Sequence, residues 1–276
     1  HFIQMLVDAQ RPSGQLPAIA PVGGFGWNWG NGPAWDALLF EYPWQMYCYY
    51  GNRENILESY DAFRRYLDYL DGMEYDGLLH FGMSDWANWE PREDFISSAY
   101  YIHFCRRMAQ FARIAGRDED ILPYSEKAER LRRNFNDAWG HPDGGYHGNE
   151  MTSLAAPLFF DIVGQDLRAE TARKLAERVR ENQWHPDFGI LGAKWVPRAL
   201  SANGFIDDAC RMFSQTEYPG WGFWAKSGSS TLWEGWSGIS SLNHIMYGDV
   251  SAWMFEYLGG LSPDWENPAF KHFTIR

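Results

Sequence analysis

Apolar residues recur along this chain at the three- and four-residue spacing of amphipathic helices. In residues 54–71 one face carries Ile56, Tyr60, Phe63, Leu67 and Leu70. The same spacing predicts about ten helices, over residues 1–10, 34–50, 54–71, 95–115, 119–139, 151–164, 167–182, 189–203, 205–215 and 241–260. No stretch shows the sustained alternation of a β-strand, so the pattern predicts an all-α protein.

The connections between these helices alternate in length. Tight turns lie near residues 51–53, 116–118, 164–166 and 204–205. The connections at 11–33, 73–94, 140–150, 183–188 and 216–239 are mostly longer and carry many of the Trp, Gly and Pro residues. Paired helices with short turns at one end and long loops at the other predict a helical toroid, an (α/α)6 barrel. Such a barrel has six helix pairs, so we expect about one pair to precede the first residue.

The chain shows no linker, because it has no Ser/Gly tract, charge block or low-complexity run. Its 276 residues are therefore predicted to form a single domain over residues 1–276. His1 to Gln10 has the pattern of a helix end, and Phe273 to Arg276 stops without a helix cap. We therefore expect a piece of a larger chain, for which neither compartment nor oligomeric state can be predicted.

The composition of the chain limits the classes of molecule that it is expected to bind. Phe, Trp and Tyr make up 17% of the chain, and many of them stand in Gly/Pro-rich stretches, where flat apolar faces suit sugars. Most of these rings are nevertheless expected to be core residues. A formal charge of −12 argues against nucleic acid or an anionic membrane as partner, and no apolar run reaches membrane-spanning length. The three cysteines, Cys48, Cys105 and Cys210, are far apart and predict buried free thiols.

One carboxylate stands between indoles in a Gly-rich stretch. Glu234 follows Trp233 and precedes Trp236 by two residues, and His244 comes ten residues later at the start of the last helix. Partial desolvation by the indoles would strengthen Glu234 as a base. Equally compatible is a structural glutamate capping a helix between two core tryptophans. His244 can donate to a sugar hydroxyl or be an ordinary buried histidine bonded to backbone.

Two further clusters pair a carboxylate with an indole. Asp85 can accept hydrogen bonds from sugar hydroxyls with Trp86 as a stacking face, or it can be a helix-capping aspartate beside a buried indole. Asp36 follows Trp35 in the first turn of a helix started by Pro33, where a carboxylate favours the helix dipole whatever its function.

The sequence has no motif for a metal, nucleotide or serine-nucleophile site. HExxH, CxxC, a phosphate loop and a G-x-S-x-G elbow are all missing from the sequence, so we predict no metal site and no cofactor. The remaining candidates are carboxylates set among indoles, which is the equipment of glycoside hydrolysis.

Six segments together resemble the catalytic domain of family 78 glycoside hydrolases, the α-L-rhamnosidases. In chain order they are Gln10 to Pro17, Gly32 to Trp35 with Pro43-Trp44, Asp85-Trp86, Tyr218 to Gly222, Thr231 to Glu234, and Ser241 to His244. Their order and approximate spacing make the resemblance much more specific than any single segment.

The resemblance implies an (α/α)6 barrel that hydrolyses terminal α-L-rhamnosides with inversion, acting on a rhamnose-containing glycoside or polysaccharide. It places the general base at Glu234 and a rhamnose-hydroxyl contact at His244. Trp35 and Trp86 would line the sugar pocket, together with Trp221 in the loop before the base and Trp233 beside it. Asp36 is also counted among the candidate substrate-binding residues, although it stands one helical position before the family's polar residue.

The family's general acid lies in an Asp/Glu/Arg-containing segment that residues 1–33 do not match, so we expect it ahead of His1. A missing acid also leaves open a non-catalytic sugar-binding homologue. Another (α/α)-barrel exo-glycosidase, including an unsaturated uronyl hydrolase, is a further alternative. A polysaccharide lyase is disfavoured, because no Tyr/His/Arg cluster for a uronate is found.

Overall fold

The computed structural model describes residues 2–21, 24, 26–27, 31–86, 88 and 90–275. The chain divides into two compact units, each assembled from segments that are distant in sequence. The first unit comprises His1–Met83, Glu93–Phe135 and Leu261–Ile275, and the second comprises Ser84–Arg92 and Asn136–Gly260. That residues 1–276 form a single domain stays a prediction.

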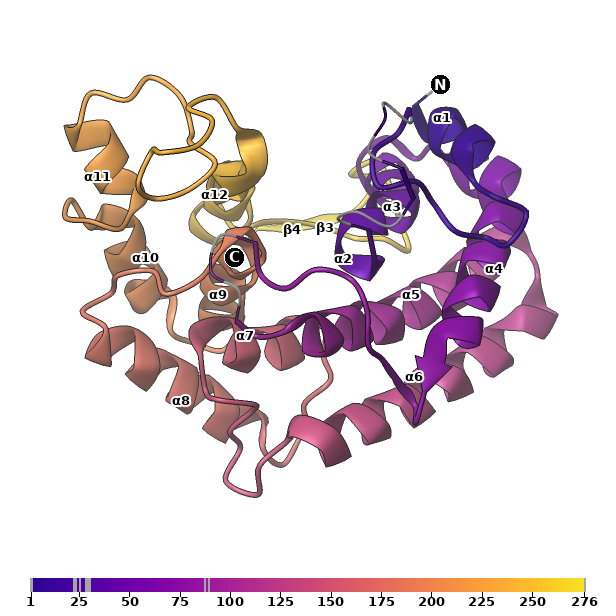
Figure 1. Cartoon of the computed structure of the whole chain (residues 1–276), viewed down its shortest axis with the longest axis horizontal. Coiled ribbons are helices and arrows are strands. Elements are labelled where there is room, and N and C mark those ends of the chain that lie inside the picture. The colour runs from indigo at the N-terminus through magenta and orange to yellow at the C-terminus, as the bar shows by residue number, and fades with distance from the viewer. Residues whose placement is uncertain are drawn as a thin grey trace. The chain divides into compact units, whose positions relative to one another are not determined.

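The first unit is built from helices and two short hairpins (Figure 1). Its helices are α1 (Phe2–Ala9), α2 (Pro33–Asp36), α3 (Leu38–Tyr50), α4 (Glu54–Met73), α5 (Glu93–Ala115) and most of α6 (Asp118–Trp139). Its antiparallel hairpins pair β1 (Glu74–Tyr75) with β2 (Leu78–Leu79), and β3 (Leu261–Pro263) with β4 (Phe273–Ile275).

Aromatic rings fill the core of the first unit. Phe40 of α3 stacks on Phe104 of α5 with ring centroids 4.4 Å apart, and Phe63 of α4 lies 5.3 Å from Phe40. All five residues of the predicted apolar face of α4 are buried. Helical spacing on α4 therefore identified the buried face correctly, because i, i+3 and i+4 positions share one side of a helix.

The second unit is centred on α9 (Ile190–Ala202), which packs against α7 (Met151–Phe159), α8 (Arg168–Glu181) and α10 (Ile206–Ser214) (Figure 1). The chain continues through α11 (Trp221–Lys226), η1 (Ile245–Asp249), α12 (Val250–Trp253) and the π-helical turn η2 (Met254–Leu258). Trp195 of α9 and Trp253 of α12 are each 1% exposed, so the core of this unit is also rich in aromatic rings.

Three details depart from the sequence prediction. Helix α11 lies inside the connection predicted to be a loop over residues 216–239, because six residues are too few to show a period. The helix predicted over 241–260 begins only at Ile245, because residues 241–244 form an irregular segment with bends at 242 and 243. Cys48 and Cys105 are buried free thiols as predicted, whereas Cys210 is partly exposed. Among the described residues, no helix is both long and apolar enough to cross a membrane.

Candidate active site

Glu234 lies on a loop that folds back on itself in the second unit. The Glu234 N–H donates to Ser241 O at 2.9 Å, and the His244 N–H donates to Leu232 O at 2.8 Å. Between these rungs Gly238 has a φ of 70°, and a Cβ there would lie 2.7 Å from the Trp233 ring. Glycine is therefore required at this turn, and the pairing places Glu234 and His244 on the same short loop.

A buried aromatic cluster anchors this loop. Trp236 stacks on Trp224 with centroids 4.8 Å apart, and Tyr247 lies 4.4 Å from Trp236. The indole N–H groups are satisfied by backbone carbonyls, Trp224 by Trp236 O and Trp236 by Phe188 O, both at 3.0 Å. Satisfied indoles in a packed cluster fix the loop without leaving buried donors unpaired.

The two flanking indoles leave Glu234 itself accessible. Trp236 is 8% exposed, whereas Glu234 is partly exposed, and its Oε2 accepts a hydrogen bond from the Ser241 N–H at 3.2 Å. His244 is also partly exposed and precedes η1. A carboxylate that is held by its own loop and still reaches solvent can take a proton from a water molecule.

Trp221 and Trp233 take different positions in the cluster. Trp221 packs 4.8 Å from both Phe213 and Trp236, and its indole N–H donates to Tyr247 O at 3.0 Å. Trp233 lies at the edge, 5.6 Å from Trp224, and stays partly exposed. Both side chains are partly exposed, but Trp221 packs inside the cluster and bonds Tyr247 O, whereas Trp233 lies at the edge of the cluster.

Asp85 has an enclosed carboxylate. The residue is 0% exposed, and it accepts hydrogen bonds from Thr152 Oγ1 at 2.7 Å, Gly189 N at 2.9 Å, Leu191 N at 2.8 Å and Gly192 N at 3.2 Å. Burial raises the pKa of Asp85 to about 6, and these hydrogen bonds act in the opposite direction.

Neither oxygen of Asp85 reaches solvent in this structure, so its predicted sugar-binding role gains no support here and stays a prediction. The alternative of a capping aspartate is supported, since its partners are the first N–H groups of α9.

Trp86 is fixed to the same helix start. Its carbonyl oxygen accepts the Ile190 N–H at 3.0 Å, and its side chain is partly exposed. A Cβ on Gly189 would lie 1.8 Å from Trp86 O, so only glycine allows the two segments to approach. Asp85 and Gly189 together set the position from which the Trp86 indole projects.

The arrangement matches a known family along most of the chain. The profile of the bacterial alpha-L-rhamnosidase 6 hairpin glycosidase domain matches residues 1–258. The chain belongs to this family. Its six-hairpin glycosidase fold accounts for the succession of helices, and the resemblance noted in the sequence is confirmed.

Relatives and solved structures agree. An alpha-L-rhamnosidase of Streptomyces avermitilis is 32% identical over 274 residues, which is 94% of this chain and 26% of that protein. A crystal structure of the alpha-L-rhamnosidase of this organism, complexed with L-rhamnose, superimposes with a TM-score of 0.90 at 28% identity, over 99% of this chain and 27% of that one. The crystal structure of an Aspergillus terreus rhamnosidase superimposes with a TM-score of 0.88 at 25% identity. The match covers 95% of this chain and 34% of that one. The chain spans about a quarter to a third of the length of the curated relatives it matches.

Trp35 and Asp36 of this rhamnosidase-family domain belong to the first unit. Asp36 is 7% exposed, and the Tyr66 hydroxyl donates to its Oδ2 at 2.6 Å. Burial raises the pKa of Asp36 to about 7. The side chain is thus a core carboxylate, and the prediction that it contacts substrate is not supported. Trp35 is partly exposed, with its Nε1 buried and without a partner among the described residues.

Sequence reasoning missed Thr152, Trp224 and Tyr247, which hold the site from behind. Thr152 and Tyr247 stand in predicted helices with no local sign of their partners, and Trp224 lies just after the Tyr218 to Gly222 segment.

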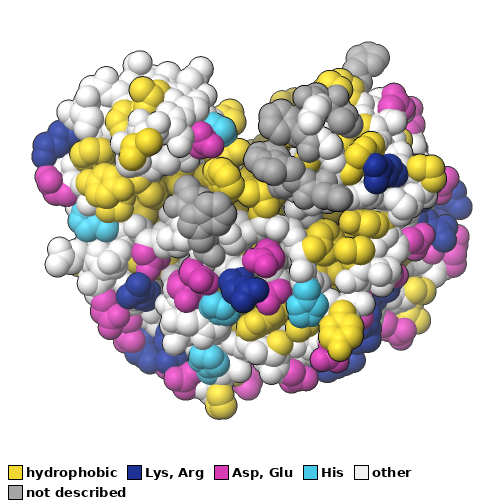
Figure 2. Space-filling model, viewed as in Figure 1, with side chains coloured by type: hydrophobic (Ala, Val, Ile, Leu, Met, Phe, Trp, Pro, Cys, Tyr) yellow, Lys and Arg dark blue, Asp and Glu magenta, His cyan; other side chains and the backbone are white. Residues whose placement is uncertain are grey.

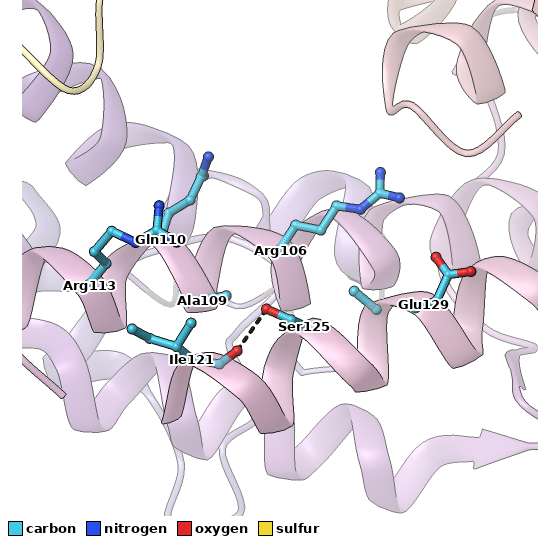
Figure 3. A pocket seen from close by; sticks show the side chains of 8 residues that line it. Arg106, Ala109, Gln110, Arg113, Ile121, Ser125 and Glu129 are labelled. Atoms are coloured by element: carbon cyan, nitrogen blue, oxygen red, sulfur yellow. Dashed lines mark hydrogen bonds between the residues drawn. The ribbon is translucent and has the colours of Figure 1, made fainter. Parts of the chain in front are cut away.

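A hollow of about 270 Å³ lies between α5 and α6, in the first unit (Figure 3). Arg106, Gln110 and Glu129 line it, and its lining has neither an aromatic ring nor a carboxylate pair, so it does not suit glycoside hydrolysis.

Proposed function

We propose that this domain contributes the general base, Glu234, to an inverting hydrolysis of terminal α-L-rhamnosides. The observation that carries the proposal is the partly exposed Glu234 carboxylate on a loop fixed by a buried aromatic cluster. Membership of the rhamnosidase family and similarity to a structure that holds L-rhamnose support the substrate. In this mechanism Glu234 removes a proton from the water that attacks the anomeric carbon.

The sugar contacts follow from what each side chain exposes. His244 shares the loop of the base and would bond a rhamnose hydroxyl. Trp86 and Trp233 would offer partly exposed ring faces to the sugar. That Trp35, which belongs to the first unit, lines the sugar pocket stays a prediction of the family resemblance. Trp221, which is also partly exposed, would contribute to the sugar site from the loop before Glu234. The general acid, expected ahead of His1, stays a prediction.

The test uses the parent protein with p-nitrophenyl α-L-rhamnoside as substrate. Glu234→Gln is expected to lower the rate by about 10²–10⁴-fold, the scale of general base catalysis. Glu217→Gln is the matched control, because Glu217 is an exposed glutamate of the same unit, paired with Lys226. The control is expected to retain full activity.

Two further readouts separate base catalysis from a loss of binding. Azide is expected to restore turnover in Glu234→Ala, since this anion needs no proton removed before it attacks. The first sugar released by the unmodified parent protein is expected to be the β-anomer by NMR. An inert parent, full activity of Glu234→Gln, or release of the α-anomer would overturn the proposed mechanism, and sugar binding without turnover would favour the non-catalytic homologue.

A further inference from the structure

Three side chains that can ligate a metal meet away from Glu234. Glu90 belongs to the segment Ser84–Arg92, and His147 and Glu150 stand in the turn before α7, all in the second unit. Each offers one ligand atom, and these atoms all lie within 4.8 Å of one another. Acidic and histidine side chains, with a basic side chain among them, gather over the part of the face where Figure 1 labels α7 (Figure 2).

The spacing of two of these atoms suits a shared ion. His147 Nδ1 and Glu150 Oε2 lie 3.2 Å apart. Two ligands at about 2.0–2.2 Å from one Zn²⁺, set at the tetrahedral angle, are separated by about 3.4 Å. Ser153 Oγ donates to Glu150 Oε2 at 2.6 Å and so orients this carboxylate, as an outer partner of a metal ligand does.

A third carboxylate lies near Glu150. Arg178 donates to Asp187 Oδ2 at 2.7 and 3.1 Å, and the Met151 N–H also bonds this carboxylate. The charges of Glu150 and Asp187 repel each other, and a divalent cation at the Glu150 carboxylate would offset this repulsion.

We propose that Glu90, His147 and Glu150 form a site for a first-row divalent cation, of which Zn²⁺ is the best match to one imidazole and two carboxylates. The ion would tie the segment that carries Asp85 and Trp86 to the turn before α7, because Glu90 lies on one and its two partners on the other. The ion would therefore be structural, stabilising the contact between these two segments, and it takes no part in the hydrolysis proposed for Glu234.

The site is tested by titrating the chain, stripped with a chelator, with Zn²⁺ in a calorimeter, and with Co²⁺ in a spectrophotometer. We expect one equivalent of Zn²⁺, a Co²⁺ d–d spectrum of low coordination number, and a higher unfolding midpoint with Zn²⁺ than without it. These readouts need no substrate, so they stand whether or not the chain is a rhamnosidase.

The variants are chosen to preserve the fold. His147 has a φ of 49°, which asparagine tolerates, so the test substitution is His147→Asn. Glu150→Gln and Glu90→Gln keep the size of each side chain. Each is expected to weaken Zn²⁺ binding at least about tenfold, because loss of an outer partner alone costs about 10–100-fold. His141→Asn, in the same loop but outside the cluster, is the control and should bind normally.

Failure to saturate with Zn²⁺, or equal weakening in His141→Asn, would mean that His147 and Glu150 form an ion pair only. Undiminished binding in His147→Asn and Glu150→Gln would place the ion elsewhere and overturn the site.

Discussion

Asp85 and Glu234 look alike in the sequence and are opposites in the structure. Each is a carboxylate next to a tryptophan. Asp85 is 0% exposed and accepts four hydrogen bonds, whereas Glu234 is partly exposed and its Oε2 accepts one from the Ser241 backbone. A carboxylate surrounded by donors organises backbone, and one that reaches solvent can exchange a proton. The number of protein donors around each carboxylate therefore separates the enclosed acid from the one that is open to solvent.

The comparison predicts its largest effect at Asp85. Replacing Asp85 by Ala leaves three backbone N–H groups and one hydroxyl buried without an acceptor, so we expect a loss of at least about 3 kcal/mol in the free energy of unfolding. Asp85→Asn, which keeps one acceptor oxygen, should lose less and remain measurable. Denaturant titration is the measurement, and Glu234→Ala, expected to lose less than about 1 kcal/mol, is the counterpart. Similar losses in the free energy of unfolding for Asp85→Ala and Glu234→Ala would contradict the distinction between an enclosed and an open carboxylate.

Asp36, the third carboxylate beside an indole, sharpens the comparison through pH. Its pKa is raised from 3.8 to about 7, so the native state holds a proton that the unfolded chain has already released. The contribution of Asp36 to stability is therefore present near pH 4 and is lost as pH rises to about 7.

The side chain of Asp36→Asn does not titrate. The free energy of unfolding of this variant should therefore rise, relative to that of the unmodified chain, as pH increases from 4 to about 7. Unfolding titrations at several pH values measure this difference, and a difference independent of pH would contradict a buried, proton-holding Asp36.

The smallest effect concerns a single donor to Asp85. Thr152→Val keeps the shape of the side chain and removes the hydroxyl that donates to Asp85 Oδ2, so we expect a loss of about 1–2 kcal/mol. Thr171→Val is the matched control, because the equally buried Thr171 hydroxyl donates only to Leu167 O of its own helix turn. Unfolding midpoints compare the two, and an equal loss would mean that Asp85 does not depend on Thr152.

Much of the fold could be predicted because helical periodicity is a local property. The face of α4 and the bounds of α8, α9 and α10 came out within a few residues, and glycine marked the end of α3 at Gly51. The short α11 and the hairpins at β1–β2 and β3–β4 were missed, since two to six residues are too few to show a period.

The candidate site also has parts that could be predicted from local sequence and parts that could not. The Trp233-Glu234 pair and His244 were found together because the loop that joins them is short, ten residues from base to histidine. The state of Asp85 could not be predicted, since its partners Thr152 and Leu191 lie 67 and 106 residues away in the chain. The cluster of Glu90 with His147 and Glu150 was missed for the same reason, and sequence motifs predicted no metal site.

The sequence by itself determined the helical class, the rhamnosidase family and the loop that carries Glu234, because these depend on period and on short motifs. Only the tertiary structure decided which carboxylate is enclosed and which is open. Burial and hydrogen-bond partners arise when distant segments meet, and this meeting encloses Asp85 and leaves the Glu234 carboxylate open to solvent.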